Sequence, residues 1–147
     1  MLKTVKLWAV SSIHHTDEGK LFQEYTKRFR FNFDQIEIKD HNNTTSDLLK
    51  LIKKMTPSEQ LILLDEHGKE NTTFDFCEFL NKISQNNQTP VFLIGGHNGH
   101  HPDIKKCAHH VMSLSKMTLP HLLARVFLVE QLYRCQQIFL NHPYHRQ

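Results

Sequence analysis

Three short segments with polar or glycine-rich composition follow apolar runs of the chain. They are Leu64–Lys69, Gly95–Gly99 and Ser113–Pro120. Ligands of open parallel sheets bind beyond the carboxyl ends of the strands, so these segments are the first candidates for a binding site. Gly95 and Gly96 directly follow an apolar run and would let the backbone approach a ligand closely. A tight strand-to-helix turn without a ligand uses the same glycines, and composition alone leaves both interpretations open.

The last seven residues combine side chains that bind and transform nucleic acids. Tyr144, His145 and Arg146 follow Pro143, which ends the preceding helical pattern. Arginine binds phosphate through paired hydrogen bonds, tyrosine stacks on bases, and histidine transfers protons near neutral pH. Chain ends are commonly frayed, so composition leaves a functional tail and a disordered polar end equally open.

Five of the 12 histidines fall in one stretch together with a cysteine. The six residues are His97, His100, His101, Cys107, His109 and His110. Adjacent side chains on a helix point about 100° apart, and no H-E-x-x-H or C-x-x-C spacing organises the group. Solvated or capping histidines are therefore favoured, and no metal site is expected. A metal-dependent hydrolase built on this cluster remains an alternative.

Signatures of several other enzyme classes are missing. The first strand–helix unit has no G-x-G-x-x-G, and the chain has neither a G-x-x-x-x-G-K-[ST] loop nor a G-x-S-x-G elbow. These absences argue against dinucleotide enzymes, P-loop nucleotidases and α/β-hydrolases.

Length and composition indicate how many domains the protein has and in which kind of compartment it works. The 147 residues have the length of one domain, expected over 1–147, and a net charge of +3 permits nucleic-acid binding without requiring it. Cys77, Cys107 and Cys135 are widely spaced and odd in number, which predicts unpaired thiols in a reducing compartment. The sequence shows no signal-peptide core and no apolar run of about 18 residues, so we expect a soluble, cytoplasmic protein.

Hydrophobic periodicity predicts strands that alternate with helices, five of each. The expected strands are Thr4–Val10, Phe33–Lys39, Leu61–Leu64, Pro90–Ile94 and Val111–Leu114. The expected helices begin after Thr16, at Thr45, before Phe76, near Asp103 and near Pro120. This alternation is typical of an α/β fold with a mostly parallel sheet flanked by helices.

The helix from Pro120 to about Leu140 is apolar on more than one face. Its apolar residues exceed the single stripe of a surface helix. In a domain of this size, a second apolar face needs another partner. A homodimer is the simplest expectation.

Four ordered motifs carry a resemblance to a known family. They are Leu64-Asp65-x-x-Gly68-Lys69, then Phe92-x-Ile94-Gly95-Gly96-x-x-Gly99, then Leu114 to His121 with Arg125 and Glu130 to Arg134, and last Pro143-Tyr144-His145-Arg146. Together they resemble the RlmH family of SPOUT-class methyltransferases, over essentially the full chain.

The resemblance implies a fold and an activity. The fold would be a SPOUT-type α/β fold with a C-terminal trefoil knot, an exception to the rule that chains do not thread their own loops. The protein would act as a homodimer on large-subunit rRNA, favouring assembled ribosomes. It would use S-adenosyl-L-methionine to methylate N3 of a pseudouridine, the 1915 site of 23S rRNA. A non-catalytic RNA-binding or ribosome-assembly factor of the same fold is the alternative, although such a protein would be expected to lose the glycines or the tail.

The resemblance also assigns site residues by position. The cofactor pocket would be lined by Leu64, Gly95, Gly96, Leu114, Ser115, Lys116, Met117, Thr118 and Leu119. Tyr144, His145 and Arg146 would reach the acceptor base, in the site of the partner subunit. A protonated imide N3 is a poor nucleophile, so it needs a base or a cation that favours its anion. We assign the base to His145 and the electrostatic role to Arg146 as hypotheses.

Overall fold

The computed structural model describes residues 2–146, whose five strands form one sheet in the order β2-β1-β4-β3-β5. All four neighbouring pairs are parallel, which confirms the predicted fold class. The trefoil knot that the resemblance implies stays a prediction. The strands are β1 Thr4–Val10, β2 Asn32–Ile38, β3 Glu59–Glu70, β4 Thr89–Ile94 and β5 His110–Ser113.

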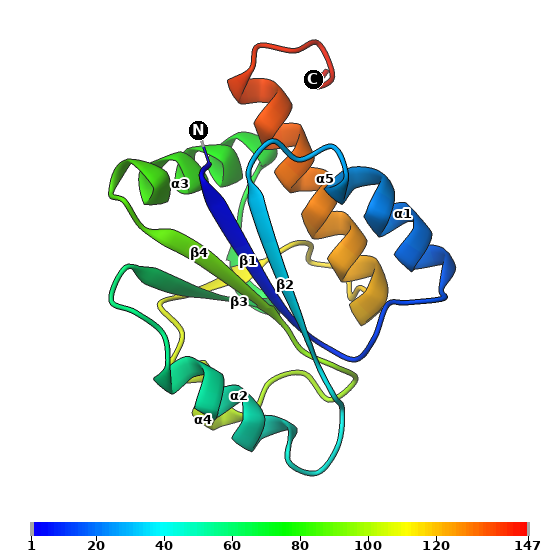
Figure 1. Cartoon of the computed structure of the whole chain (residues 1–147), viewed down its shortest axis with the longest axis vertical. Coiled ribbons are helices and arrows are strands. Elements are labelled where there is room, and N and C mark those ends of the chain that lie inside the picture. Colours follow the sequence, from blue (N-terminus) through cyan, green and yellow to red (C-terminus); the bar gives the residue numbers. More distant parts are fainter. Residues whose placement is uncertain (1, 147) are drawn as a thin grey trace.

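Helices cover both faces of this sheet (Figure 1). They are α1 Asp17–Thr26, α2 Thr44–Lys53, α3 Thr73–Gln85, α4 Pro102–Lys105 and α5 His121–Phe139. One apolar cluster joins the sheet to α1, α3 and α5, and a second joins its other face to α2 and α4. Because the side chains of a strand alternate between faces, Leu61 and Leu63 belong to the second cluster while Ile62 belongs to the first. Over residues 2–146 we find no helix with both the length and the apolar content needed to cross a membrane.

Strand β3 is longer than its apolar run predicts. The expected strand ended at Leu64, but β3 continues to Glu70 through an irregularity between Leu64 and Lys69. The extension pairs with β5, and a Cβ on Gly68 would lie 2.7 Å from the backbone nitrogen of Met112. This close approach of two backbones requires glycine, and it turns the polar end of β3 along β5.

The cysteine prediction is wrong for two of the three residues. Cys77 of α3 and Cys135 of α5 form a disulfide, with Cα atoms 5.3 Å apart. They are separated by 58 residues in the sequence and meet because both helices pack on the same face of the sheet. Cys107 carries a free thiol.

Helix α5 buries one face and leaves apolar side chains on another. Leu128, Val129 and Leu132 are fully buried against the sheet. Leu123 and Phe127 are 45% and 38% exposed, and they share one face because they are four residues apart. The second apolar face predicted for this helix therefore has no cover within residues 2–146.

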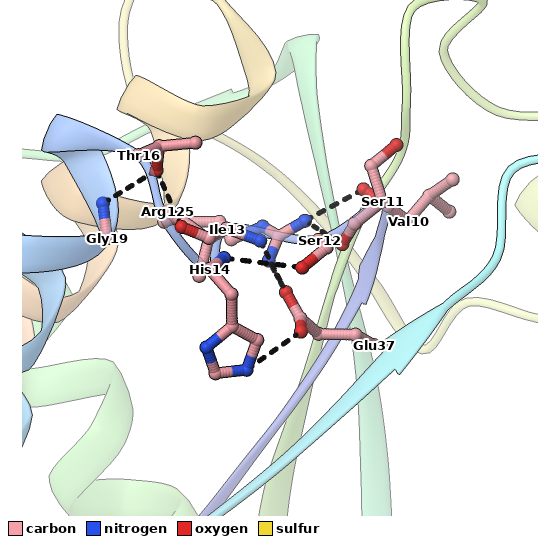
Figure 2. A network of polar contacts seen from close by, with 9 residues as sticks. All are labelled: Val10, Ser11, Ser12, Ile13, His14, Thr16, Gly19, Glu37 and Arg125. Carbon is pink, nitrogen blue, oxygen red and sulfur yellow. Dashed lines mark hydrogen bonds and ion pairs between the residues drawn. The ribbon is translucent and has the colours of Figure 1, made fainter.

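A buried arginine anchors the start of α5 to the carboxyl end of β1 (Figure 2). Arg125 is fully buried, and it donates to the carbonyl oxygens of Val10, at 2.8 Å, and Ser11. Its second terminal nitrogen donates to Glu37 Oε2 at 2.7 Å, and that carboxylate also accepts from the backbone of Ile13. Ser11 has a φ of 80°, so the chain leaves β1 in a left-handed conformation that the guanidinium holds.

We predict that Arg125→Ala lowers the free energy of unfolding by about 3–5 kcal/mol, because it removes one member of a buried ion pair and leaves two carbonyls without a donor. Urea denaturation measures the change. Arg28→Ala, which alters an exposed arginine of the same type, should leave the unfolding midpoint nearly unchanged. Equal midpoints for the two variants would contradict this role of Arg125.

Candidate functional site

A cavity of about 800 Å³ lies at the carboxyl ends of β3, β4 and β5. Its volume is within the range of cofactor and drug-sized sites. Residues 64–67, 94–100, 114–115 and 117–122 form most of its wall, so each of the three segments singled out from the sequence contributes to it. Parallel strands bring these segments together because their carboxyl ends share one edge of the sheet.

Eight of the nine predicted cofactor residues line this cavity. They are Leu64, Gly95, Gly96, Leu114, Ser115, Met117, Thr118 and Leu119. Lys116 does not line it, because its side chain is 79% exposed and its ammonium lies 3.7 Å from Glu70 Oε2. The structure therefore brings the predicted set together with one exception.

The glycine segment forms a tight turn that only glycine permits at its first position. Gly96 and Gly99 form an antiparallel bridge, and the nitrogen of Gly99 donates to the carbonyl of Gly96 at 3.2 Å. A Cβ on Gly95 would lie 2.7 Å from the carbonyl oxygen of Gly99, closer than such contacts occur. Gly99 itself has a φ of +67°, in the left-handed region. The turn thus brings backbone close to the cavity, which His97 and Asn98 of the same segment also line.

A hydrogen bond joins two walls of the cavity. The hydroxyl of Thr118 donates to Glu66 Oε2 at 2.6 Å, across 52 residues of sequence. Within residues 113–117 the hydroxyl of Ser113 donates to the carbonyl of Ser115, and the hydroxyl of Ser115 accepts from the nitrogen of Met117. These bonds fix the curve of the segment that leads from β5 to α5.

The histidine cluster divides between the cavity and local capping. His100 Nε2 lies 2.8 Å from the carbonyl of Leu64, so this nitrogen donates, and burial lowers the pKa of the ring. His101 Nδ1 accepts from the nitrogen of Asp103 at the start of α4, and His109 Nδ1 accepts from the nitrogen of Leu61. Among the residues that the structure describes, no three histidine, cysteine or acidic side chains are grouped to hold a metal ion.

Sequence reasoning did not assign several cavity residues. Asp65 and Lys105 line it as an ion pair, 3.4 Å apart. Burial raises the pKa of Asp65, but the backbone N–H of His67 and the ammonium of Lys105 outweigh it and hold that pKa below its usual range. Glu18 reaches the cavity from α1, and His121 from the start of α5. Glu18 gives no local signal in the sequence, because only the packing of α1 brings it to this edge.

The C-terminal tail folds back on the far end of α5. The hydroxyl of Tyr144 donates to Glu130 Oε1 at 3.2 Å, and the guanidinium of Arg134 lies 4.9 Å from the centre of its ring. Glu130 and Arg134 are one helical turn apart and form an ion pair at 2.6 Å. The aromatic ring of Tyr133 packs on the edge of Tyr144. The tail is therefore ordered by specific contacts and is not a frayed end.

The same contacts determine which ring nitrogen of His145 accepts a hydrogen bond. Arg134 Nη1 lies 3.1 Å from His145 Nδ1, and a guanidinium can only donate. Nδ1 therefore accepts, and in the neutral ring the hydrogen sits on Nε2. The ring also meets Phe74 edge-on, with centroids 5.0 Å apart. In this position His145 offers a donor to its surroundings. A role as a base requires the imidazole to leave Arg134.

The tail and the cavity of one chain lie at opposite ends of α5. His121 lines the cavity, while Arg134 contacts the tail. Arg134 comes 13 positions after His121, a span of about 20 Å at 1.5 Å per residue. Figure 1 shows α5 running from the carboxyl end of β1 to the opposite end of the molecule, where the chain ends. Within one chain, the predicted cofactor residues and the predicted tail residues of the same reaction therefore lie far apart.

Methyltransferases are similar to this chain in sequence. The family model described as "Predicted SPOUT methyltransferase" matches residues 3–145. The "Ribosomal RNA large subunit methyltransferase H" of Flavobacterium psychrophilum is 37% identical over 97% of this chain and 99% of its own length. The protein of the same name from Nitrosomonas eutropha is 48% identical, in a match that spans 63% of this chain and 59% of that relative. The chain therefore belongs to the SPOUT methyltransferases, and within them to the ribosomal RNA large subunit methyltransferase H family. This confirms the resemblance found in the sequence.

Solved structures agree on the fold. A probable methyltransferase from Bordetella pertussis Tohama I has a TM-score of 0.58 at 9% identity, covering 91% of this chain and 93% of its own. The SpoU methyltransferase AviRb from Streptomyces viridochromogenes, solved in complex with AdoMet, has a TM-score of 0.50 at 15% identity. It matches 94% of this chain and 61% of its own. At such identities the likeness shows the fold alone.

The contacts of the docked tail should give the Tyr144 phenol an unusually high pKa. Burial, with the nearby Glu130 carboxylate, raises the pKa of Tyr144 from 10.0 to about 12. The neutral phenol is the favoured form, so its contribution to stability is present below pH 10 and is lost as the pH rises toward 12. The difference in phenolate absorbance between the wild type and Tyr144→Phe should therefore have a midpoint near 12. Glu130→Gln should lower that midpoint, and a wild-type midpoint near 10 would show that the tail is not docked.

Proposed function

We propose that this protein is an S-adenosyl-L-methionine-dependent methyltransferase of large-subunit rRNA, and that it methylates N3 of a pseudouridine, the 1915 site of 23S rRNA. One observation carries the proposal. A glycine turn and the segment 114–119 face one cavity at the carboxyl edge of the sheet, in a chain of the ribosomal RNA large subunit methyltransferase H family. We place the activity in the cytoplasm.

The cavity fits the proposed methyl donor in size and chemistry. Gly95 and Gly96 expose backbone groups where a Cβ would collide with Gly99 or approach Asp40, and backbone donors and acceptors suit an adenosyl group. Leu64, Ile94 and Leu122 supply apolar wall. The carboxylate of Asp65, held ionised by its partners, suits a cationic sulfonium. When bound, S-adenosyl-L-methionine supplies a methyl group that is already activated for displacement.

The residues of this chain then have to align the acceptor and make it nucleophilic. The acceptor N3 carries a proton, and its anion is stabilised by donors and cations placed around the base. Tyr144 is neutral at physiological pH, since even the unperturbed tyrosine pKa of 10.0 lies well above it, so it positions and donates. Arg146 supplies positive charge. His145 takes the N3 proton only after its Nδ1 is released by Arg134, which requires the tail to move when the acceptor binds.

A second copy of the chain completes the site in this proposal. The tail of one chain docks about 20 Å along α5 from its own cavity. Leu123 and Phe127 leave an apolar strip on α5 between these two places, and a second copy would cover it. A homodimer across α5 would hide this strip and bring each tail to the cavity of the partner.

Labelled methyl transfer tests the activity. Purified protein with methyl-labelled S-adenosyl-L-methionine should label large ribosomal subunits that lack the modification, and nucleoside mass spectrometry should identify N3-methylpseudouridine. Gly95→Ala should reduce transfer on the order of 100-fold, because the new Cβ shifts the turn and misplaces the donor by about an ångström.

Lys116→Ala is the matched control, since Lys116 belongs to the same loop cluster but points to Glu70 and away from the cavity. It should retain nearly full transfer. Absence of labelling by the wild type, with ribosomes and with bare rRNA, would refute the proposed activity. Labelled uridine in place of pseudouridine would refute the acceptor.

A further inference from the structure

We propose that the outer surface of α2 and α4 is the part of this protein that holds the phosphate backbone of its RNA substrate. We define this basic surface as Lys50, Lys53, Lys54, Lys105 and Lys106. All five side chains are exposed. The proposal rests on the proposed function, because it identifies the surface that binds the same RNA substrate at a distance from the reacting base.

The lysines of α2 differ from the basic residues of the helices on the opposite face of the sheet. Lys20 of α1, Lys82 of α3 and both arginines of α5 each form an ion pair with a carboxylate. Within residues 2–146, the structure gives the side chains of Lys50, Lys53 and Lys54 neither an ion pair nor a hydrogen-bond partner. Their positive charge is therefore not neutralised by the protein itself.

The three lysines gather at the carboxyl end of α2. Lys50 and Lys53 are in its last turn and Lys54 is its C-cap residue. The helix dipole favours positive charge at this end, while like charges three and four residues apart repel one another. A bound polyanion relieves that repulsion, and RNA is the polyanion that the proposed activity provides.

One lysine of the basic surface, Lys105, also lines the cavity. Leu48 of α2 and Ile104 of α4 are buried in one apolar cluster, which holds the two short helices side by side. Figure 1 shows them together on the face of the sheet opposite α1 and α5. Lys105 of α4 lines the cavity through its ion pair with Asp65, while the next residue, Lys106, has no such partner in the described chain. The surface thus has one lysine in the wall of the cavity, and its other four side chains lie outside the cavity lining.

Phosphate contacts of this kind position a substrate without reading its sequence. They make affinity depend steeply on salt, because each neutralised phosphate releases counterions. The surface should therefore determine how tightly the RNA is held, and the cavity and tail should determine what happens to the base.

The test compares two triple variants with the same loss of charge. The first is Lys50→Gln with Lys53→Gln and Lys54→Gln. The control is Lys20→Gln with Lys27→Gln and Lys82→Gln, which removes three lysines that are paired with carboxylates. Binding to large-subunit rRNA stripped of protein is measured from 50 to 300 mM salt, on the order of the physiological range. Unfolding midpoints of both variants verify that they are folded.

In the α2 variant, the magnitude of the slope of log affinity against log salt should fall by about 2–3, roughly 0.9 for each lost phosphate contact. Its KM for ribosomes should rise about tenfold, while kcat should remain nearly unchanged. The control should behave as the wild type. A wild-type slope in the α2 variant, or equal losses in both variants, would overturn the proposal. Normal binding to stripped rRNA with weakened binding to whole subunits would overturn it in favour of an acidic ribosomal protein.

Calorimetry with S-adenosyl-L-methionine separates this proposal from the proposed function. Both variants should bind the methyl donor as the wild type does, since the altered lysines lie outside the cavity lining. If the wild type binds rRNA with the expected salt slope but takes up no methyl donor, the basic surface stands and the proposed activity fails.

Discussion

The length and direction of α5 constrain every part of this protein. The helix begins at His121 in the wall of the cavity and ends at Phe139, so its 19 residues carry the chain about 28 Å from the cavity. Arg125 ties its first turns to the carboxyl end of β1, and Glu130 with Arg134 receives the tail at its other end. Because both ends are anchored, the tail of one chain cannot fill its own cavity without giving up these contacts. The exposed strip of Leu123 and Phe127 lies along the first half of the helix, where we propose that a second copy binds.

The shape of the cavity depends on closely packed backbone more than on charged side chains. Gly95 has no room for a side chain beside Gly99, and the segment after β5 is curved by hydrogen bonds among Ser113, Ser115 and Met117. Such a site can bind a donor that arrives already activated, because alignment is the main task left to the protein. The groups proposed to act on the acceptor are in the tail, and the proposed phosphate-binding surface lies on α2 and α4. In the proposed function, donor binding, acceptor chemistry and RNA affinity are therefore assigned to three separate parts of a small fold.

Much of this arrangement was predictable from the sequence. The first strand has the predicted bounds, Thr4–Val10, and α5 follows Pro120 as its pattern indicates, because hydrophobic periodicity reports local geometry directly. The meeting of the glycine turn and segment 114–119 at one cavity was predictable because parallel strands place their carboxyl ends together. The polar continuation of β3 to Glu70, the Cys77–Cys135 disulfide and the outward turn of Lys116 were not predictable. Each depends on which distant segments pack side by side, and no local pattern records that.

The central claim is that a cavity and a tail from different chains form one site. Mixed dimers test this claim most directly. One copy carries Gly95→Ala, the other lacks residues 144–147, and different affinity tags allow the mixed species to be isolated after co-expression. Each parent homodimer should be inactive in methyl transfer. The mixed dimer contains one intact cavity facing one intact tail, so it should recover about half of the wild-type activity. Mixed dimers as inactive as their parents would contradict the account.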